Sequence, residues 1–152
     1  MSSAEIFNYL QIDERVATTG QPTEDQLREA AAEGFTAIVN LAPVNPPYTP
    51  EDEAGLAQLL GMEYVHIPVD WSNPTDDDFA AFETAMNRLS AERVLIHCAA
   101  NFRVTAFYSL YARKHLGWTE ERAQALRAII WANDRYPVWE AFIRRKTAEI
   151  ET

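Results

Sequence analysis

The chain has 152 residues, of which 47% are hydrophobic and 24% are charged, so it is long enough for one domain with an ordinary hydrophobic core. We therefore expect a single domain over residues 1–152. Acidic residues outnumber basic ones by 23 to 13, and the formal net charge of −10 argues against nucleic acid and anionic membranes as partners. The sequence contains no apolar run of membrane-spanning length and does not begin with a basic-then-apolar signal pattern. A lone cysteine excludes an internal disulfide and favours a reducing compartment, so we expect a cytoplasmic protein.

Predicted strands and helices alternate along most of the chain, and the last part is helical. This order is typical of an α/β fold with a central, mainly parallel sheet of four or five strands, flanked by helices and extended by extra C-terminal helices. In chain order, the sequence predicts a strand at residues 15–20, a helix at 23–34, strand 35–41, helix 49–61, strand 62–69, helix 75–90, strand 93–98 and helices ending at 116, 133 and 150.

Three of the predicted helices begin with a threonine that can cap the free N–H groups of the first turn. Thr23 is followed three residues later by Gln26, which makes a capping box. Thr49 precedes Pro50, a residue favoured at the first helical position. Thr75 precedes three aspartates, and acids in a first turn complement the helix dipole.

The segment "RVLIHCAANFRVTAF" places the only cysteine where a predicted strand gives way to a helix. Ligands of parallel α/β sheets bind at the carboxyl ends of the strands, and a helix N-terminus favours an anion, including the thiolate of Cys98. The guanidinium of Arg103 can grip two oxygens of a bound oxyanion. Asn101 tolerates a left-handed backbone, and Ala99 and Ala100 leave room for the loop to wrap an anion. The alternative is that Cys98 is a small buried hydrophobic residue and Arg103 a solvated or ion-paired surface arginine.

The same segment resembles the phosphate-binding loop of protein tyrosine and dual-specificity phosphatases, in which His-Cys is followed by five residues, an arginine and a serine or threonine. The stretch "TTGQPTEDQLREAAAEGFTAIVNL" is similar to the bacterial domain-of-unknown-function 442 group, which is related to tensin-type phosphatases. The resemblance covers residues 16–117. It implies a cysteine-phosphatase-like fold, with Cys98 as nucleophile, Arg103 as oxyanion clamp and an aspartate as general acid. It also implies a phosphate-binding loop made of His97, Ala99, Ala100, Asn101, Phe102, Val104 and Thr105.

The loop departs from this pattern because only four residues separate Cys98 from Arg103. In one alignment the loop is shortened and Arg103 keeps its anion-binding role. In the other the loop keeps its length, Val104 replaces the arginine, and Thr105 occupies the hydroxyl position. The six-residue span from cysteine to arginine also resembles the active loop of rhodanese-type sulfurtransferases, in which the cysteine carries a persulfide.

Several residues outside the loop are candidates for supporting roles. Asp70 follows a predicted strand and is the candidate general acid, with a turn aspartate as the alternative. His97 precedes the nucleophile, points to the opposite face of its strand and is expected to orient the loop. Gly20, Gln21 and Trp71 are candidate pocket residues, Gly20 because glycine permits unusual dihedral angles.

The sequence therefore predicts a cysteine-dependent phosphatase that hydrolyses a phosphomonoester through a cysteinyl-phosphate. The expected partner is a phosphorylated small molecule or phosphoprotein, and phosphate or sulfate is expected to bind the loop. No cofactor and no metal ion are expected. The alternatives are a rhodanese-like sulfurtransferase with a persulfide on Cys98 and a non-catalytic phosphate-binding pseudophosphatase.

Overall fold

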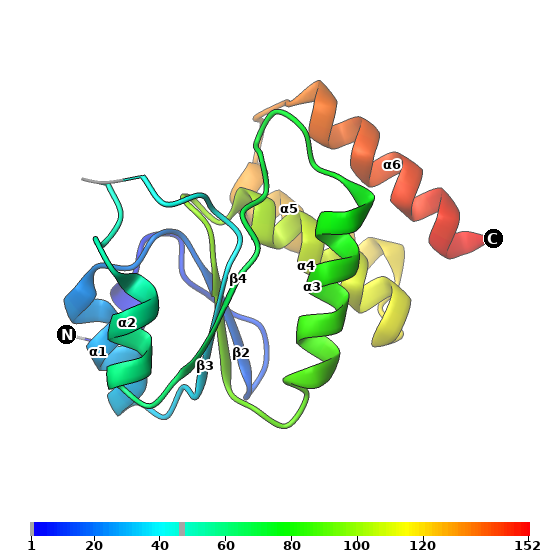
Figure 1. Ribbon diagram of the computed structural model, residues 1–152. Helices are drawn as coiled ribbons and strands as arrows, with labels where there is room; N and C mark the ends of the chain where they lie inside the picture. Colours follow the sequence, from blue (N-terminus) through cyan, green and yellow to red (C-terminus); the bar gives the residue numbers. More distant parts are fainter. Residues whose placement is uncertain (1, 46–47) are drawn as a thin grey trace.

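The computed structural model describes residues 2–45 and 48–152, and within them a five-stranded sheet lies between two layers of helices (Figure 1). The strands are β1 (Leu10–Gln11), β2 (Val16–Thr19), β3 (Ala37–Asn40), β4 (Glu63–His66) and β5 (Val94–His97). The helices are a 3-10 turn η1 (Ser3–Glu5), α1 (Glu24–Ala32), α2 (Glu53–Leu59), α3 (Asp76–Arg88), α4 (Phe102–His115), α5 (Glu120–Trp131) and α6 (Pro137–Glu151). The predicted α/β class and mainly parallel sheet are confirmed.

The strands lie in the order β1-β2-β5-β3-β4, and only β1 runs antiparallel to its neighbour. The carboxyl ends of the four parallel strands therefore meet at one edge of the sheet, where α/β proteins bind their ligands. Because β5 lies between β2 and β3, the residues after it emerge at the centre of this edge. The cysteine that follows β5 is thus flanked by the loops that follow β2 and β3.

Both faces of the sheet are covered, which explains why β5 is an uninterrupted apolar strand. Val94 and Ile96 pack in the larger core cluster with α3, α4, α5 and α6, whereas Leu95 packs in the smaller cluster with α1 and α2. The two helical layers can be followed on either side of the sheet in Figure 1. Alternation along β5 therefore sends His97 toward α2 and leaves Cys98 in the larger cluster.

The helix caps follow the sequence prediction at two positions and depart from it at the third. Thr23 and Thr75 each form the predicted cap, and both cap a complete capping box. Helix α2 begins at Glu53 rather than at Thr49, with Asp52 as its N-cap. The Thr49 hydroxyl instead accepts a hydrogen bond from the Asn45 amide at 2.9 Å and closes the preceding loop. The prediction that Thr49 caps this helix was wrong, because the Thr49 hydroxyl is hydrogen-bonded within the preceding loop.

Strand β1 was not predicted, because two residues carry too little periodicity to be recognised. It pairs Leu10 with Thr18 and Gln11 with Ala17.

Among the described residues, no helix has the length and apolar character needed to span a membrane.

Candidate active site

Cys98 is a free cysteine at the floor of a small pocket at the carboxyl edge of the sheet. Its side chain is only 1% exposed, yet it lines a cavity of about 240 Å³. Arg103 lines the same cavity, and so do Ala99, Ala100 and three aromatic residues, Trp71, Phe102 and Tyr136. The two residues that carry the predicted chemistry therefore share one pocket.

Arg103, rather than Val104, reaches this pocket. Val104 is fully buried in the larger core cluster, which is the geometry of the shortened loop. The guanidinium carbon of Arg103 lies 5.5 Å from the centroid of the Trp71 ring. Within residues 2–45 and 48–152, Arg103 forms no hydrogen bond and no ion pair, and its Nε atom is buried without a partner. An arginine without a carboxylate partner in so acidic a protein is well placed to bind an anion.

Two asparagines fix the loop between β5 and α4. Asn101 has a left-handed backbone with φ of 73°, as its residue type allows. Its side-chain amide donates to the Asn8 carbonyl at 2.8 Å and to the Thr18 hydroxyl at 3.0 Å. In return the Asn8 side chain donates to the Ala100 carbonyl at 3.0 Å. Asn8 was not predicted, because nothing in its local sequence indicates a contact 92 residues away.

The loop meets α4 at a helix N-terminus with free amide groups. The first intrahelical bond of α4 runs from the Thr105 amide to the Asn101 carbonyl at 3.0 Å, so the amides of Phe102, Arg103 and Val104 have no acceptor within the helix. Such a turn binds anions. The Thr105 hydroxyl lies 2.9 Å from the Asn101 carbonyl and accepts a hydrogen bond from the Trp131 indole at 3.1 Å. The Thr105 hydroxyl is therefore bonded between α4 and α5.

Gly20 allows the turn after β2 to approach this loop closely. A Cβ atom at Gly20 would lie 2.7 Å from the Ala99 carbonyl oxygen, closer than van der Waals contact permits. The Gln21 amide donates to that carbonyl at 2.9 Å, and the Gly20 amide donates to the Phe7 carbonyl at 2.7 Å. Gly20 does not have a positive φ, so the prediction that it supplies an unusual dihedral angle was wrong. The position requires glycine because two backbones meet there.

His97 links the Cys98 loop to the buried carboxylate of Glu53. Its Nε2 donates to Glu53 Oε2 at 2.6 Å, and its Nδ1 lies 3.3 Å from the Cys98 carbonyl oxygen. Gln21 donates to the other oxygen of Glu53 at 2.9 Å. Both His97 and Glu53 are buried, at 0% and 5% exposure.

Burial raises the pKa of Glu53, but hydrogen bonds and the charge of His97 outweigh it, so the pKa lies below its ordinary value. Burial likewise raises the pKa of Tyr64, which lies next to Glu53, to about 12. Sequence reasoning missed Glu53. An acid in a first helical turn ordinarily complements the helix dipole, and nothing local distinguishes it from Glu51 or Asp52.

Asp70 lies on the loop after β4, next to the pocket residue Trp71. It is exposed, its carboxylate accepts a hydrogen bond from the Ser72 amide at 2.8 Å, and its carbonyl accepts one from Asn73 at 3.0 Å. These contacts are those of a turn aspartate. As far as the chain is described, Asp70 does not line the pocket of Cys98, and its role as general acid stays a prediction.

A second pocket of about 530 Å³ adjoins the first and shares Ala99 and Arg103 with it. Gln21 lines this pocket as well as being bonded to the loop through its backbone amide. The segment after β3 forms a wall, as expected, although Pro46 and Pro47 lie outside the described residues. The described lining residues of this wall are Ala42, Pro43, Val44, Asn45, Tyr48 and Thr49.

The C-terminal helices support the aromatic side of the active-site pocket. Trp71 stacks on Trp131 and Trp139 with ring centroids 6.0 and 5.4 Å apart, and it meets Tyr136 edge-on at 4.9 Å. The Trp139 indole donates to the Trp71 carbonyl at 2.8 Å. Helices α5 and α6 thus position Trp71, a role that their own sequence did not indicate.

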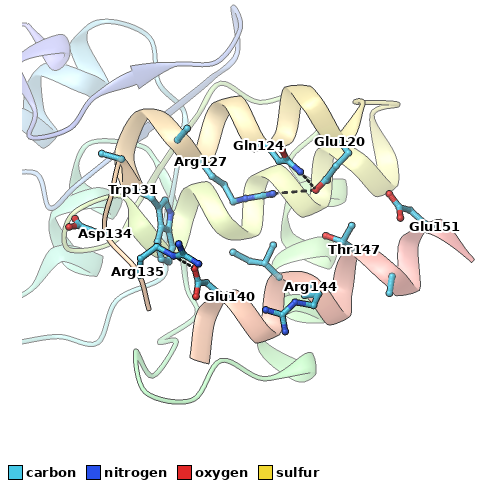
Figure 2. Close-up of a pocket in the computed structure, with 14 residues that line it drawn as sticks. Glu120, Gln124, Arg127, Trp131, Asp134, Arg135, Glu140, Arg144, Thr147 and Glu151 are labelled. Carbon is cyan, nitrogen blue, oxygen red and sulfur yellow. Dashed lines mark hydrogen bonds and ion pairs between the residues drawn. The ribbon is translucent and has the colours of Figure 1, made fainter. Parts of the chain in front are cut away.

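A larger pocket, of about 810 Å³, lies between α5 and α6 (Figure 2). Charged side chains line it, and two pairs of them are bonded to each other: Arg127 with Glu120, and Arg135 with Glu140. Arg127 also donates to the Ser109 hydroxyl. Neither Cys98 nor Arg103 lines this pocket, so its size does not make it the candidate active site.

Comparison with known proteins matches residues 8–114 to the family described as the phosphatase-like domain of beta-lactamase hydrolase-like protein. Such a protein from Xylella fastidiosa (strain Temecula1 / ATCC 700964) is 33% identical over 103 residues, which are 65% of this chain and 23% of the relative. The chain thus matches about a quarter of the length of that relative. A DUF442 protein of known structure from Shewanella putrefaciens CN-32 is 32% identical, with a TM-score of 0.89 and 97% of each chain covered.

Tk-PTP in its active form is 20% identical, with a TM-score of 0.75 over 91% of this chain and 95% of the other, and shares the fold. The predicted resemblance is confirmed by the family match and by the fold. The chain belongs to the phosphatase-like domain family of the beta-lactamase hydrolase-like proteins, the DUF442 group within the tyrosine-phosphatase-like fold.

Proposed function

We propose that the protein is a cysteine-dependent phosphatase that hydrolyses a phosphomonoester through a cysteinyl-phosphate intermediate. The observation that carries the proposal is the shared pocket of Cys98 and Arg103, in which the arginine has no other ionic partner within the described chain. Membership of a phosphatase-like family supports the same reaction class. The lone cysteine also favours a reducing compartment, and we place the protein in the cytoplasm on that ground.

In the first step the Cys98 thiolate attacks phosphorus, the S–P bond forms and the bond to the leaving oxygen breaks. The free amides at the start of α4 and the guanidinium of Arg103 bind the equatorial oxygens, where charge develops. Asp70 donates a proton to the leaving oxygen. Water then attacks phosphorus and gives a proton to the Asp70 carboxylate, the S–P bond breaks, inorganic phosphate leaves, and the Cys98 thiolate is restored.

Turnover of p-nitrophenyl phosphate between pH 5 and 8 tests this mechanism. We expect Cys98→Ser and Arg103→Ala each to lower kcat/KM by at least about 100-fold, the scale for loss of a transition-state contact. Arg28→Ala is the matched control, because Arg28 lies in an exposed ion pair on α1 and its loss leaves kcat/KM unchanged. Acid-quenched wild-type protein is expected to carry phosphate on Cys98. A wild type no more active than Cys98→Ser would contradict the proposal.

The role of Asp70 has a test of its own. Asp70→Asn is expected to lower kcat by about 100-fold or more and to remove the loss of activity at high pH, since the asparagine has no proton to lose. Asp77→Asn is the matched control, because Asp77 is an exposed first-turn acid of α3. An Asp70→Asn protein with the kcat and pH profile of wild type would leave Asp70 as a turn residue only.

The two alternative functions predict different results in the same preparation. A sulfurtransferase accumulates a persulfide on Cys98 and transfers sulfur from thiosulfate to cyanide. A non-catalytic module binds inorganic phosphate in the loop and turns over neither substrate.

A further inference from the structure

Three pockets adjoin along the carboxyl edge of the sheet and form one groove, which we call the substrate groove. Ala99 lines all three of them. The inner pocket contains Cys98, the middle pocket shares Arg103 with it, and the outer pocket of about 580 Å³ shares Gln21 with the middle one. A substrate whose phosphoryl group sits on Cys98 has room for its remaining atoms in this groove.

Arg103 is the only cationic side chain among the described residues that line the substrate groove. The two residues after Asn45 that the structure does not describe, Pro46 and Pro47, carry no charge in the sequence. Arg103 and the helix amides serve the phosphoryl group on Cys98. A second anionic group would therefore meet no cation in the groove.

The walls of the groove add acceptors and negative charge. Glu24 and Glu51 line the outer pocket, and both are exposed. The side-chain amide of Gln21 uses its two N–H groups on Glu53 and on the Pro22 carbonyl, so it has none left for an anion. At the opposite end, the aromatic wall of Trp71, Phe102 and Tyr136 offers apolar contact. In a protein of net charge −10, neither end adds a cationic side chain for a further negative charge.

We propose that the substrate carries one phosphoryl group joined to an uncharged or cationic leaving group, and that the substrate groove rejects polyphosphorylated and other multiply anionic compounds. This inference rests on the proposed phosphatase function and names its substrate class. Selectivity arises from unfavourable placement of a second anion near Glu24 and Glu51, rather than from added contacts to the preferred substrate.

The test compares two nearly isosteric substrates, 4-carbamoylphenyl phosphate and 4-carboxyphenyl phosphate, together with inositol 1,4,5-trisphosphate as a polyanion. We expect kcat/KM for 4-carboxyphenyl phosphate to be about tenfold below that for 4-carbamoylphenyl phosphate, which is the scale of a like-charge contact. Release of phosphate from the trisphosphate is expected to be slower still. Glu51→Lys is expected to raise the ratio of carboxylate to amide kcat/KM several-fold. Glu121→Lys changes the net charge equally from the exposed first turn of α5, and it is expected to leave that ratio unchanged.

The outcomes separate the two proposals. If wild type hydrolyses the amide and the carboxylate equally, or prefers the trisphosphate, the substrate class is wrong and the phosphatase proposal stands. If Glu121→Lys changes the ratio as much as Glu51→Lys, total charge decides selectivity and the substrate groove does not. If wild type hydrolyses none of the three compounds nor p-nitrophenyl phosphate, the phosphatase proposal fails and the substrate class falls with it.

Discussion

At the scale of single residues, the candidate site depends on two polar contacts, one buried and one partly buried, with distant parts of the chain. Glu53 holds His97, whose ring lies beside the Cys98 carbonyl, and Asn8 is bonded to the loop while Asn101 is bonded back to Asn8. Buried polar groups are costly unless they are fully paired, so these contacts favour one geometry of the loop. Cys98 is thus positioned by residues that do not line its pocket in the described part of the chain.

Glu53→Gln tests the contribution of the buried carboxylate. The folded pKa of Glu53 lies below its ordinary value, so the ionised form stabilises the fold above that ordinary value, and this stabilisation is lost as the pH falls through the folded pKa. We expect Glu53→Gln to lower the free energy of unfolding by about 1.5–3 kcal/mol at pH 7, with the difference shrinking toward pH 3. Urea unfolding at several pH values measures it. Exposed Glu51→Gln is the control, and a difference that does not vary with pH would mean that packing, not charge, is responsible.

At the scale of elements, the site is the junction of β5, the four-residue loop 98–101 and α4. Parallel pairing brings the ends of β2, β3 and β5 together, so the turn at Gly20 and the loop of Cys98 must pass at backbone distance. The alternation of β5 sends His97 and Cys98 to opposite faces, one toward α2 and the other toward the pocket. The elements therefore decide which side chains line the pocket and which lie behind it.

Gly20→Ala tests the close approach of the two backbones. The added Cβ would press on the Ala99 carbonyl, and we expect a loss of about 1–3 kcal/mol in the free energy of unfolding together with a large loss of kcat. Gly61→Ala is the matched control. Gly61 has φ of 77° and open space around it, so alanine there costs about 1–2 kcal/mol in stability and leaves kcat unchanged. Equal kcat values for the two variants would show that the contact at Gly20 is structural only.

At the scale of the whole molecule, two helical layers of unequal size cover the sheet, and the larger one includes helices beyond the matched family region. Trp139 on α6 is fully buried, stacks on Trp71 and donates a hydrogen bond to the Trp71 carbonyl. Helix α5 contributes Trp131, which bonds to Thr105 near the start of α4. The C-terminal helices are thus part of the same core as the pocket.

Trp139→Ala tests whether α6 is integral to that core. Removal of a fully buried tryptophan is expected to lower the free energy of unfolding by about 3–5 kcal/mol, as cavities of this size do. Ile129→Ala is the control, because Ile129 is 62% exposed on α5 and its truncation is expected to cost no more than about 0.5 kcal/mol. Urea unfolding of both variants checks the prediction, and similar values for the two would place α6 outside the cooperative core.

Local interactions explain why much of this molecule was predictable. The caps at Thr23 and Thr75 depend on hydrogen bonds between residues three apart, and β5 is marked by a continuous apolar run. Cys98 and Arg103 were found because they are close in sequence and stand at a strand–helix junction. Strand β1 and the start of α2 were missed, because the first is too short to show a pattern and the second depends on a loop that binds Thr49.

The sequence by itself determined the alternation of strands and helices, the position of Cys98 before a helix N-terminus, and the net charge of −10. Only the tertiary structure decided that Arg103 rather than Val104 lines the pocket, that Glu53 pairs with His97, and that Asn8 is bonded to the loop. The physical reason is range. Periodicity and capping act over a few residues. The contacts of Glu53 and Asn8 instead join groups 44 and 92 positions apart, which parallel strand pairing and burial bring together. The placement of Arg103 depends on how the start of α4 packs.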